Sequence, residues 1–378
     1  MKIIFDASPE TMYPLAGPGF SGGSQVYIKA IVRGLLARGH EVHVIAPDLQ
    51  IEERRGVNEF WWPVGYHPRQ FDVAVMQMHA RENPPYEAPV CVLMTSCVDP
   101  YLGPGDQWAD AFEAVPVFSQ THKELLLATR PTIKPERIHI TGLGVDLGDY
   151  PPDSATGEET VGDCVSYHAY KIPGRMLYAN DPARGLFYTL DIFDEVRKRV
   201  PQATLHVTYD FVRQMGYRQW EHSQMAQYLW ECKYRLENTP GVVNVGAPER
   251  DGIVREQLEC QVHCMPSDPP GIGTQTHGIT QMECGAAGAA LVLSDVEAFP
   301  EVFGEGATIL PRIGQYLPEA ERRVTAADYA EVVSELMQDP AKWAEESRRA
   351  RALAEANTWD DVVARWATML ETLTGVAW

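Results

Sequence analysis

The segment from Met265 to Leu310 most constrains how this chain can fold. The residues that lead into it, Val262–Met265, have the composition of a short buried strand that a proline ends, and Ala290–Ser294 predicts a second strand. Between them lie a glycine-rich loop and the start of a helix, with Thr280 placed to cap that helix near Glu283. In open α/β sheets, ligands bind where a strand leads into a helix N-terminus, and the N–H groups of that terminus attract anions. The segment therefore predicts a platform for a phosphorylated or polyhydroxylated ligand.

The residues of this platform resemble a known signature. Seven residues separate Gln275 from Glu283, Gly278 lies between them, and Gly288 follows Glu283 by five positions. The chain then continues with a strand and with Ser294-Asp295, Pro300-Glu301 and Gly304-Glu305-Gly306-Ala307. This order resembles the Glu-x7-Glu signature of family 4 glycosyltransferases. In this chain Gln275 stands at the first glutamate of the signature, and His277 stands at its usual aromatic residue.

The resemblance implies a fold and a set of site residues. The fold is α/β, with two Rossmann-like parallel-sheet domains that face each other across a cleft, the B-type glycosyltransferase architecture. Glu283 would accept hydrogen bonds from the ribose hydroxyls of a nucleotide, and Gln275 would contact the hydroxyls of the donor sugar. An amide can donate and accept there, although it carries no negative charge. The loop between them would also bind the donor, through His277, Gly278, Ile279 and Thr280.

The N-terminal half begins with a predicted strand at Lys2–Asp6 and a helix at Ser24–Arg38, which Gly39 would end. Gly22 and Gly23 precede this helix. The resemblance implies that this glycine pair lets the backbone approach the donor and acceptor sugars closely. A tight strand-to-helix turn without a binding role is the alternative interpretation.

Further strands are predicted at Val73–His79 and Val90–Thr95, and strands at 115–119 and 138–140 are expected to close the first sheet. The family often places a histidine after one of these strands, near the bond being transferred. Thr95-Ser96-Cys97 occupies the expected position, so His79 is the nearest substitute. A structural histidine is the alternative for His79.

The C-terminal half opens with a predicted strand, Arg175–Asn180, and a loop that resembles the phosphate loop of the family. In that loop Arg184 precedes Gly185 at a helix start, where it would bind a diphosphate through two hydrogen bonds. A solvated surface arginine is the alternative. Asn180 is included among the donor-binding residues. Arg250 would line the nucleobase loop, or it would simply cap a helix.

Length and alternation predict the domain organisation. A chain of 378 residues exceeds what a single core usually supports. Alternating strands and helices predict parallel sheets with helices on both faces. We expect an N-terminal domain at 1–150, a linker or insertion at 151–174, a nucleotide-sugar-binding domain at 175–357, and a C-terminal helix at 358–378 that crosses back to the first domain. Thr358 and Asp361 predict a capping box at the start of that helix. The resemblance covers nearly the whole chain and is weakest between Glu52 and Arg137.

Composition limits the partners. The net charge of −20 disfavours nucleic acid, which usually requires a basic face. No apolar run is long enough to span a bilayer, and the first residues predict a strand and not a signal peptide. Seven scattered cysteines without a CxxC pair fit a cytoplasmic location, with Cys260 and Cys264 as core thiols. The sequence has no convincing Asp-x-Asp motif, so we expect neither a metal nor a cofactor beyond the donor substrate.

The predicted function is a hexosyltransferase-type enzyme that moves a sugar from a UDP- or GDP-linked donor to a hydroxyl acceptor with retention of configuration. Gln275, Glu283, Arg184 and His79 are the candidate catalytic residues. Three alternatives remain open: a non-catalytic nucleotide-sugar-binding protein, a nucleotide-sugar epimerase of the same fold, and a glycosyltransferase that acts on modified nucleic-acid bases.

Overall fold

The computed structural model describes residues 1–8, 15, 22–65, 67–81, 84–150, 170–211, 223–267, 275–313 and 324–376. The chain divides into two compact units, which we call unit 1 (residues 1–144 and 357–378) and unit 2 (residues 145–356). Two regions of the sequence analysis lie outside the described residues: the glycine-rich loop at 271–274 and most of the segment 151–174, from 151 to 169.

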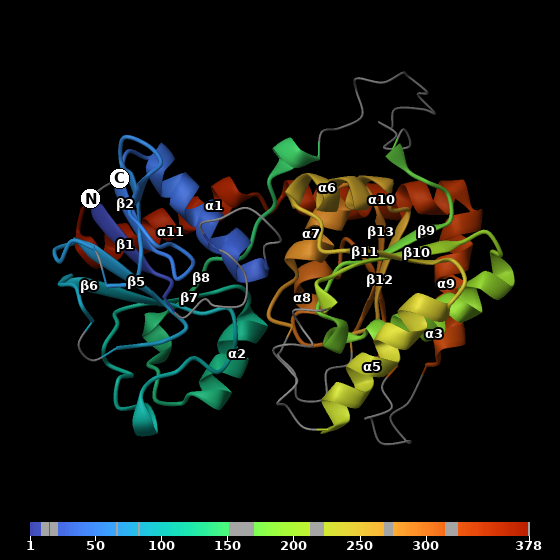
Figure 1. The fold of residues 1–378 in the computed structure, drawn as a ribbon, viewed down its shortest axis with the longest axis horizontal. Helices are drawn as coiled ribbons and strands as arrows, with labels where there is room; N and C mark the ends of the chain where they lie inside the picture. The colour runs from blue at the N-terminus through green and yellow to red at the C-terminus, as the bar shows by residue number, and fades with distance from the viewer. Residues whose placement is uncertain are drawn as a thin grey trace. The chain divides into compact units, whose positions relative to one another are not determined.

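Unit 1 contains a six-stranded sheet (Figure 1). Its strands, in spatial order, are β3 (Glu53–Arg54), β4 (Glu59–Trp62), β2 (Glu41–Ile45), β1 (Lys2–Asp6), β5 (Val73–Gln77) and β6 (Val90–Met94). All neighbours pair in parallel except β3 and β4, which are antiparallel. The strands from 2 to 94 confirm the predicted parallel α/β class, whereas β3 and β4 were not predicted.

The expectation that strands near 115 and 138 close this sheet is wrong. β7 (Val115–Val117) and β8 (Ile138–Ile140) pair with each other in a separate two-stranded sheet. A single bridge between Val92 and Ala114 connects them to β6. Pro116 lies in the middle of β7 and lacks the N–H group that a longer ladder would use.

The helices of unit 1 come from both ends of the chain. They are α1 (Gly23–Ala37), α2 (Gln120–Thr129) and α11 (Trp359–Thr374), with short 3₁₀ turns at Pro104–Asp106 and Pro135–Arg137. The predicted capping box at the start of α11 is confirmed, because Thr358 and Asp361 exchange side-chain and backbone hydrogen bonds. The helix α11 packs on α1, and the buried Trp366 indole donates to the Tyr27 hydroxyl at 2.9 Å.

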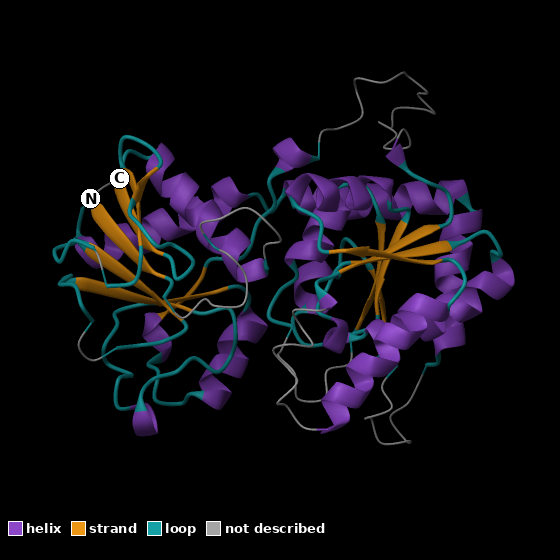
Figure 2. Ribbon diagram, in the orientation of Figure 1, coloured by secondary structure: helices purple, strands orange, loops and turns teal. Residues whose placement is uncertain are grey.

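Unit 2 contains a second six-stranded sheet, and every pair in it is parallel. Its spatial order is β11 (Val242–Gly246), β10 (Thr204–Thr208), β9 (Arg175–Tyr178), β12 (Val262–Met265), β13 (Ala290–Ser294) and β14 (Thr308–Leu310). Helices cover both faces, as Figure 2 shows. They are α3 (Leu186–Arg199), α5 (Ser223–Asn238), α6 (Arg250–Glu259), α7 (Ile279–Ala286), α8 (Phe299–Phe303), α9 (Ala326–Gln338) and α10 (Pro340–Glu355), with 3₁₀ turns at Leu147–Asp149 and Pro182–Arg184.

The chain enters each sheet near its centre and crosses once from one half of the sheet to the other, a reversal of strand order. In unit 2 it starts at β9, adds β10 and β11 on one side, and then crosses to β12, β13 and β14 on the other. In unit 1 the corresponding reversal lies between β1 and β5. Ligands of doubly wound sheets bind at such a reversal, beyond the carboxyl ends of the strands.

Buried apolar residues surround the unit 2 sheet. Cys260 and Cys264 are fully buried free thiols, which confirms them as core residues. No helix among the described residues has both the length and the apolar character needed to cross a bilayer.

The contact between α1 and α11 yields a test of this packing. A Cβ atom on Gly34 would overlap the Val363 side chain, closer than van der Waals contact allows, so the two helices can approach this closely only because residue 34 is glycine. We expect Gly34→Ala to lower the free energy of unfolding more in the wild type than in a Val363→Ala background. The coupling in a double-mutant cycle should be about 1 kcal/mol or more. The gain in helix propensity occurs in both backgrounds and cancels.

The measurement is the free energy of unfolding in urea for the four proteins of the cycle. Additivity within about 0.5 kcal/mol would contradict the packing of α11 against α1.

Candidate functional site

The predicted donor-binding residues of unit 2 gather at the carboxyl edge of its sheet. Asn180 follows β9, Ser267 follows β12 and Glu297 follows β13, and these three strands are neighbours. The strands are parallel, so their carboxyl ends lie at one edge. The reversal of strand order falls between β9 and β12. The site therefore occupies the position where doubly wound sheets bind their ligands.

A close backbone approach positions Arg184 in this site. Gly185 has φ +119°, and a Cβ atom there would lie 2.6 Å from the carbonyl oxygen of Pro266. Both the dihedral angle and the space therefore require glycine. As a result, the residue before α3 lies against the end of β12, and the Arg184 guanidinium donates to Oε1 of Gln275 at 3.1 Å.

Gln275 is fixed on several sides. Its Nε2 donates to Oγ of Ser267 at 3.0 Å, while its Oε1 accepts from Arg184. Its backbone N–H donates to the carboxylate of Glu297, and its carbonyl accepts from the N–H of Ala298 at 3.1 Å. Gln275 is 5% exposed, so its amide lies inside the site and not on the surface.

The N-terminus of α7 lacks the predicted cap. Gly278 is the N-cap and makes no side-chain cap hydrogen bond. The expectation that Thr280 caps the helix is wrong, because Thr280 lies in the first turn and its hydroxyl donates to the carbonyl of Ala179 at 3.2 Å. The buried Nδ2 of Asn180 has no hydrogen-bond partner among the described residues. The backbone N–H groups at the start of α7 and the side-chain amide of Asn180 can thus donate hydrogen bonds to a ligand at this edge.

Glu283 lies one turn farther along α7 and is 5% exposed. Its Oε1 accepts from Nη1 of Arg250 at 2.6 Å, and its Oε2 accepts from Nε2 of Gln257 at 2.9 Å. Arg250 also donates to Asp149 at 2.7 Å and to the Tyr150 hydroxyl at 3.0 Å. Arg250 is the first residue of α6, so its guanidinium pairs with Glu283 in addition to its place at a helix start.

The residues between Gln275 and Glu283 are partly packing residues. His277 is buried, and its ring meets the ring of Phe303 nearly edge-on at 6.0 Å. A Cβ atom on Gly278 would lie 3.1 Å from Phe303. Ile279 is half-buried at the first position of α7. His277 therefore packs against Phe303 in this structure.

Unit 1 holds the remaining predicted residues. Gly22 is the N-cap of α1 with φ −77°, an angle open to other residues, and Gly23 is the first helical residue. The hydroxyl of Ser24 lies 3.2 Å from that of Ser96, which connects this helix start to the loop after β6. His79 follows β5 and packs edge-on against Tyr101 at 5.5 Å. Burial lowers the pKa of His79.

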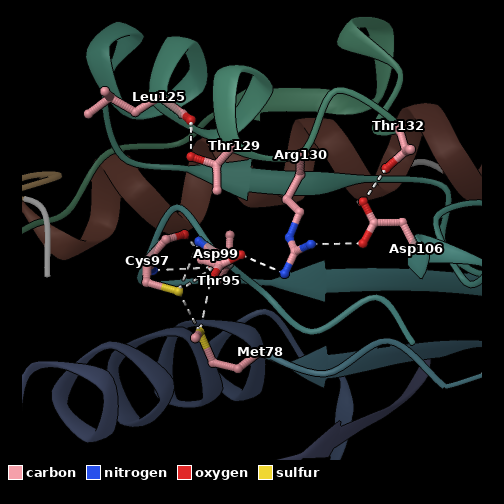
Figure 3. A network of polar contacts seen from close by, with 9 residues as sticks. All are labelled: Met78, Thr95, Cys97, Asp99, Asp106, Leu125, Thr129, Arg130 and Thr132. Carbon is pink, nitrogen blue, oxygen red and sulfur yellow. Dashed lines mark hydrogen bonds and ion pairs between the residues drawn. The ribbon is translucent and has the colours of Figure 1, made fainter. Parts of the chain in front are cut away.

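Figure 3 shows how the loop after β6 is held. The Thr95 hydroxyl donates to the Cys97 carbonyl at 2.7 Å, and the sulfur of Met78 lies 3.8 Å from the Cys97 thiol. Arg130 bridges Asp99 at 2.6 Å and Asp106 at 2.9 Å. The loop that occupies the position of the expected histidine is thus rigidly supported and carries a thiol and hydroxyls.

A buried histidine, His122, also contacts this loop. Its Nδ1 accepts from the N–H of Phe118 at 3.2 Å, so its Nε2 carries the proton and donates to the Cys97 carbonyl at 3.1 Å. Burial lowers its pKa to about 4. Both ring nitrogens are engaged, so His122 is a structural residue.

The sequence analysis missed a buried acid at the centre of the unit 1 edge. Asp6, the last residue of β1, is 2% exposed. It accepts from the Ser8 hydroxyl at 2.6 Å and the Tyr86 hydroxyl at 3.2 Å, and it lies 3.4 Å from Arg81. An acid that ends an apolar strand at a strand-order reversal was a usable signal. Within the described residues, no group of three or more potential ligands is placed to hold a metal ion.

Comparisons of the whole chain show which known proteins share this fold. No family model matches the sequence, and no curated protein matches it in a sequence comparison. Solved structures do match. Sucrose-phosphate synthase from Thermosynechococcus elongatus matches with a TM-score of 0.67 at 12% identity, over 99% of each chain. A glycosyltransferase from Rickettsia africae matches with a TM-score of 0.64 at 12% identity, over 98% of each chain. HepE from Anabaena, solved with UDP and glucose, matches with a TM-score of 0.61 at 14% identity, over the full length of both.

The fold is that of the B-type glycosyltransferases. The fold prediction is thereby confirmed. Within this B-type fold, unit 2 brings together Arg184 with Gln275 and, through α7, Arg250 with Glu283. Gly22, Gly23 and His79 belong to unit 1. Glu297, Gln257 and Ser267 are polar contacts of the predicted residues that the sequence analysis did not single out.

The pairing of Glu283 with Arg250 predicts unequal effects of two substitutions. Arg250→Met removes the cationic partner of a buried carboxylate, and we expect it to cost about 1–3 kcal/mol of stability, discounted for the partial exposure of Arg250. Asp149→Asn removes the charge of the more exposed partner of the same arginine and should cost about 0–1 kcal/mol of stability. The free energy of urea unfolding measures both. Equal losses would show that Glu283 does not depend on Arg250.

Proposed function

We propose that this protein is a glycosyltransferase that moves a sugar from a nucleotide-diphosphate donor to a hydroxyl acceptor with retention of configuration and without a metal ion. The observation that carries the proposal is the position of Arg184. It lies at the start of α3, fixed against Gln275, at the strand-order reversal of unit 2. The fold shared with solved glycosyltransferases, one of them holding UDP and glucose, supports the same assignment.

Arg184 and the start of α7 would neutralise the diphosphate. Glycosyl transfer releases a nucleoside diphosphate, and the charge that develops on it needs cations or aligned backbone dipoles. The α7 N-terminus supplies hydrogen-bond donors, as does Nδ2 of Asn180, for which the described part of the chain offers no hydrogen-bond partner. Together with the guanidinium of Arg184, they give a leaving-group site that does not require a metal.

Glu283 would hold the ribose. Each of its oxygens accepts one protein hydrogen bond, from Arg250 and from Gln257. A carboxylate oxygen can accept a second hydrogen bond, so both ribose hydroxyls can donate to it while the protein contacts stay in place. Arg250 fixes the direction of the carboxylate, and the loop that leads into α6 would lie near the nucleobase. The donor would be UDP- or GDP-linked.

The chemistry follows from the leaving group. The transition state resembles an oxocarbenium ion, and stabilising the departing diphosphate lowers its barrier. Retention results when the acceptor hydroxyl attacks from the face that the diphosphate leaves. Burial lowers the pKa of His79, which favours the neutral imidazole, and a neutral imidazole can accept the proton of the acceptor.

A non-catalytic nucleotide-sugar-binding protein is the second candidate. The observation that favours it is Gln275, whose amide oxygen is already engaged by Arg184 and carries no charge. The glycosyltransferase would release nucleoside diphosphate from its donor, whereas the binding protein would not. We expect the wild-type protein to release nucleoside diphosphate from at least one member of a panel of UDP- and GDP-sugars, and the product to keep the anomeric configuration of the donor by NMR.

Two results of this assay would overturn the proposal. Binding of a nucleotide sugar without release of diphosphate would favour the binding protein. Conversion of the donor into an epimer without release would favour the epimerase that the sequence also left open.

Arg184→Ala tests the diphosphate site. We expect the variant to lose most of its preference for UDP over uridine, or for GDP over guanosine, because the guanidinium would contact the diphosphate of the nucleotide and not its nucleoside. Calorimetric titration measures the two affinities. Lys198→Ala, which removes an exposed cation near the end of the same helix, is the matched control and should leave the ratio unchanged. An Arg184→Ala variant with wild-type preference would show that Arg184 is only a surface charge.

Chelation tests the absence of a metal. We expect turnover to persist after treatment with a chelator and dialysis, because Arg184 and the α7 N-terminus take the charge of the diphosphate. The measurement is the rate of diphosphate release before and after treatment. Complete loss that added magnesium or manganese restores would contradict metal independence.

A further inference from the structure

Glu297 brings a carboxylate to Gln275 from the neighbouring strand. It follows β13, and its Oε2 accepts the backbone N–H of Gln275. The next residue, Ala298, donates its N–H to the carbonyl of Gln275 at 3.1 Å. One hydrogen bond therefore joins Gln275 to Glu297 and a second joins Gln275 to Ala298, and together they hold the carboxylate beside the Gln275–Arg184 pair.

The backbone at Glu297 is strained. Its φ is +46°, in the left-handed region where glycine and asparagine are the favoured residues. Such a conformation costs free energy and persists mainly where the side chain or the surrounding structure requires it. A glycine would form this turn without strain, so the turn alone gives no reason for a glutamate.

The second oxygen of Glu297 remains available. Oε1 makes no hydrogen bond within the described part of the chain, and the residue is half-buried. The charge of Arg184 acts on this carboxyl, as does that of Arg312. The site thus combines the guanidinium of Arg184, the amide of Gln275 and the carboxylate of Glu297, whose second oxygen can accept another hydrogen bond.

Gln275 is the residue that makes this arrangement informative. It stands where the Glu-x7-Glu signature has an acid, and it offers only an amide whose oxygen already accepts from Arg184. The missing negative charge is present at the same point, but it belongs to residue 297.

We propose that Glu297 binds hydroxyl groups of the donor sugar and supplies, from the end of β13, the carboxylate that residue 275 lacks. The proposal rests on the proposed function, because it assigns a contact within the same donor site. The ligand it requires is a neutral sugar with free hydroxyls, since a carboxylate accepts from hydroxyl groups and repels an anionic substituent.

The test compares the affinities of UDP-glucose with UDP and of GDP-mannose with GDP, by calorimetry, in the wild type and in Glu297→Gln. The amide keeps the shape of the side chain and still accepts from the N–H of Gln275, but the charge is gone. We expect the preference for the bound nucleotide sugar over its diphosphate to fall about tenfold, as for loss of a charge-assisted hydrogen bond. Affinity for the diphosphate alone should not fall, because the substitution removes a negative charge beside Arg184. Glu305→Gln removes an exposed acid after α8 and is the control, with no expected effect.

The pH dependence of the sugar preference distinguishes a charged contact between Glu297 and the sugar from a purely structural role of Glu297. Burial raises the pKa of Glu297 above its ordinary value of 4.5, while the Gln275 N–H and the charges of Arg184 and Arg312 oppose the rise. Protonation therefore removes the charge as the pH falls through this raised pKa. We expect the sugar preference of the wild type to fall in that range and that of Glu297→Gln to stay flat.

Glu297→Asn keeps the proposal testable if the glutamine variant folds poorly. Asparagine tolerates a positive φ, so this variant should be at least as heat-stable as Glu297→Gln while its shorter side chain loses the sugar preference. A folded Glu297 variant with the wild-type preference for the sugar overturns the proposal. If the wild type binds UDP or GDP but prefers neither sugar form, the role of Glu297 fails and the nucleotide site stands. If it binds no nucleotide, both proposals fail.

Discussion

The close approach of Gly185 to Pro266 is the constraint on which the rest of the candidate site depends. Only glycine allows the start of α3 to lie against the end of β12, both by its φ and by the space available. That contact places Arg184 beside Gln275, and the same edge then receives Ser267 from β12 and Glu297 from β13. A rigid backbone contact at the strand-order reversal thus sets the positions of one cation and its polar partners.

A second network connects the site to the start of unit 2. Arg250 links Glu283 to Asp149, and the Tyr150 hydroxyl joins Arg250 to Gln257. Tyr150 is fully buried, and its carbonyl accepts from Arg351 of α10 at 2.6 Å. The carboxylate proposed to hold the ribose is thus oriented by residues from α6, from α10 through Tyr150, and from the segment that opens unit 2. A buried carboxylate needs such support, because an unpaired charge in this position would be costly.

Local patterns predicted much of this molecule, and long-range pairings account for what they missed. Apolar periodicity located β12, β13 and the central strands, and the pair Thr358–Asp361 revealed the start of α11. The expected cap by Thr280 was wrong, because its hydroxyl donates to Ala179, 101 positions earlier in the chain. Glu297 was overlooked for the same reason: its partner Gln275 is 22 positions away, and no local spacing marks the pair. The prediction that the strand near 115 belongs to the first sheet was wrong, because β7, which contains Pro116, pairs with β8 in a separate sheet. Local spacing does not show which neighbour a strand pairs with.

The central claim is that the carboxyl edge of unit 2 binds the diphosphate of a nucleotide sugar. Hydrogen–deuterium exchange of the full chain, measured with and without saturating UDP or GDP, tests it most directly. The account predicts slower exchange of the backbone amides at the start of α7, near Ile279, and around Arg184, because these groups would donate to or pack against the bound phosphates. Unchanged exchange in both segments, or protection confined to unit 1, would contradict it.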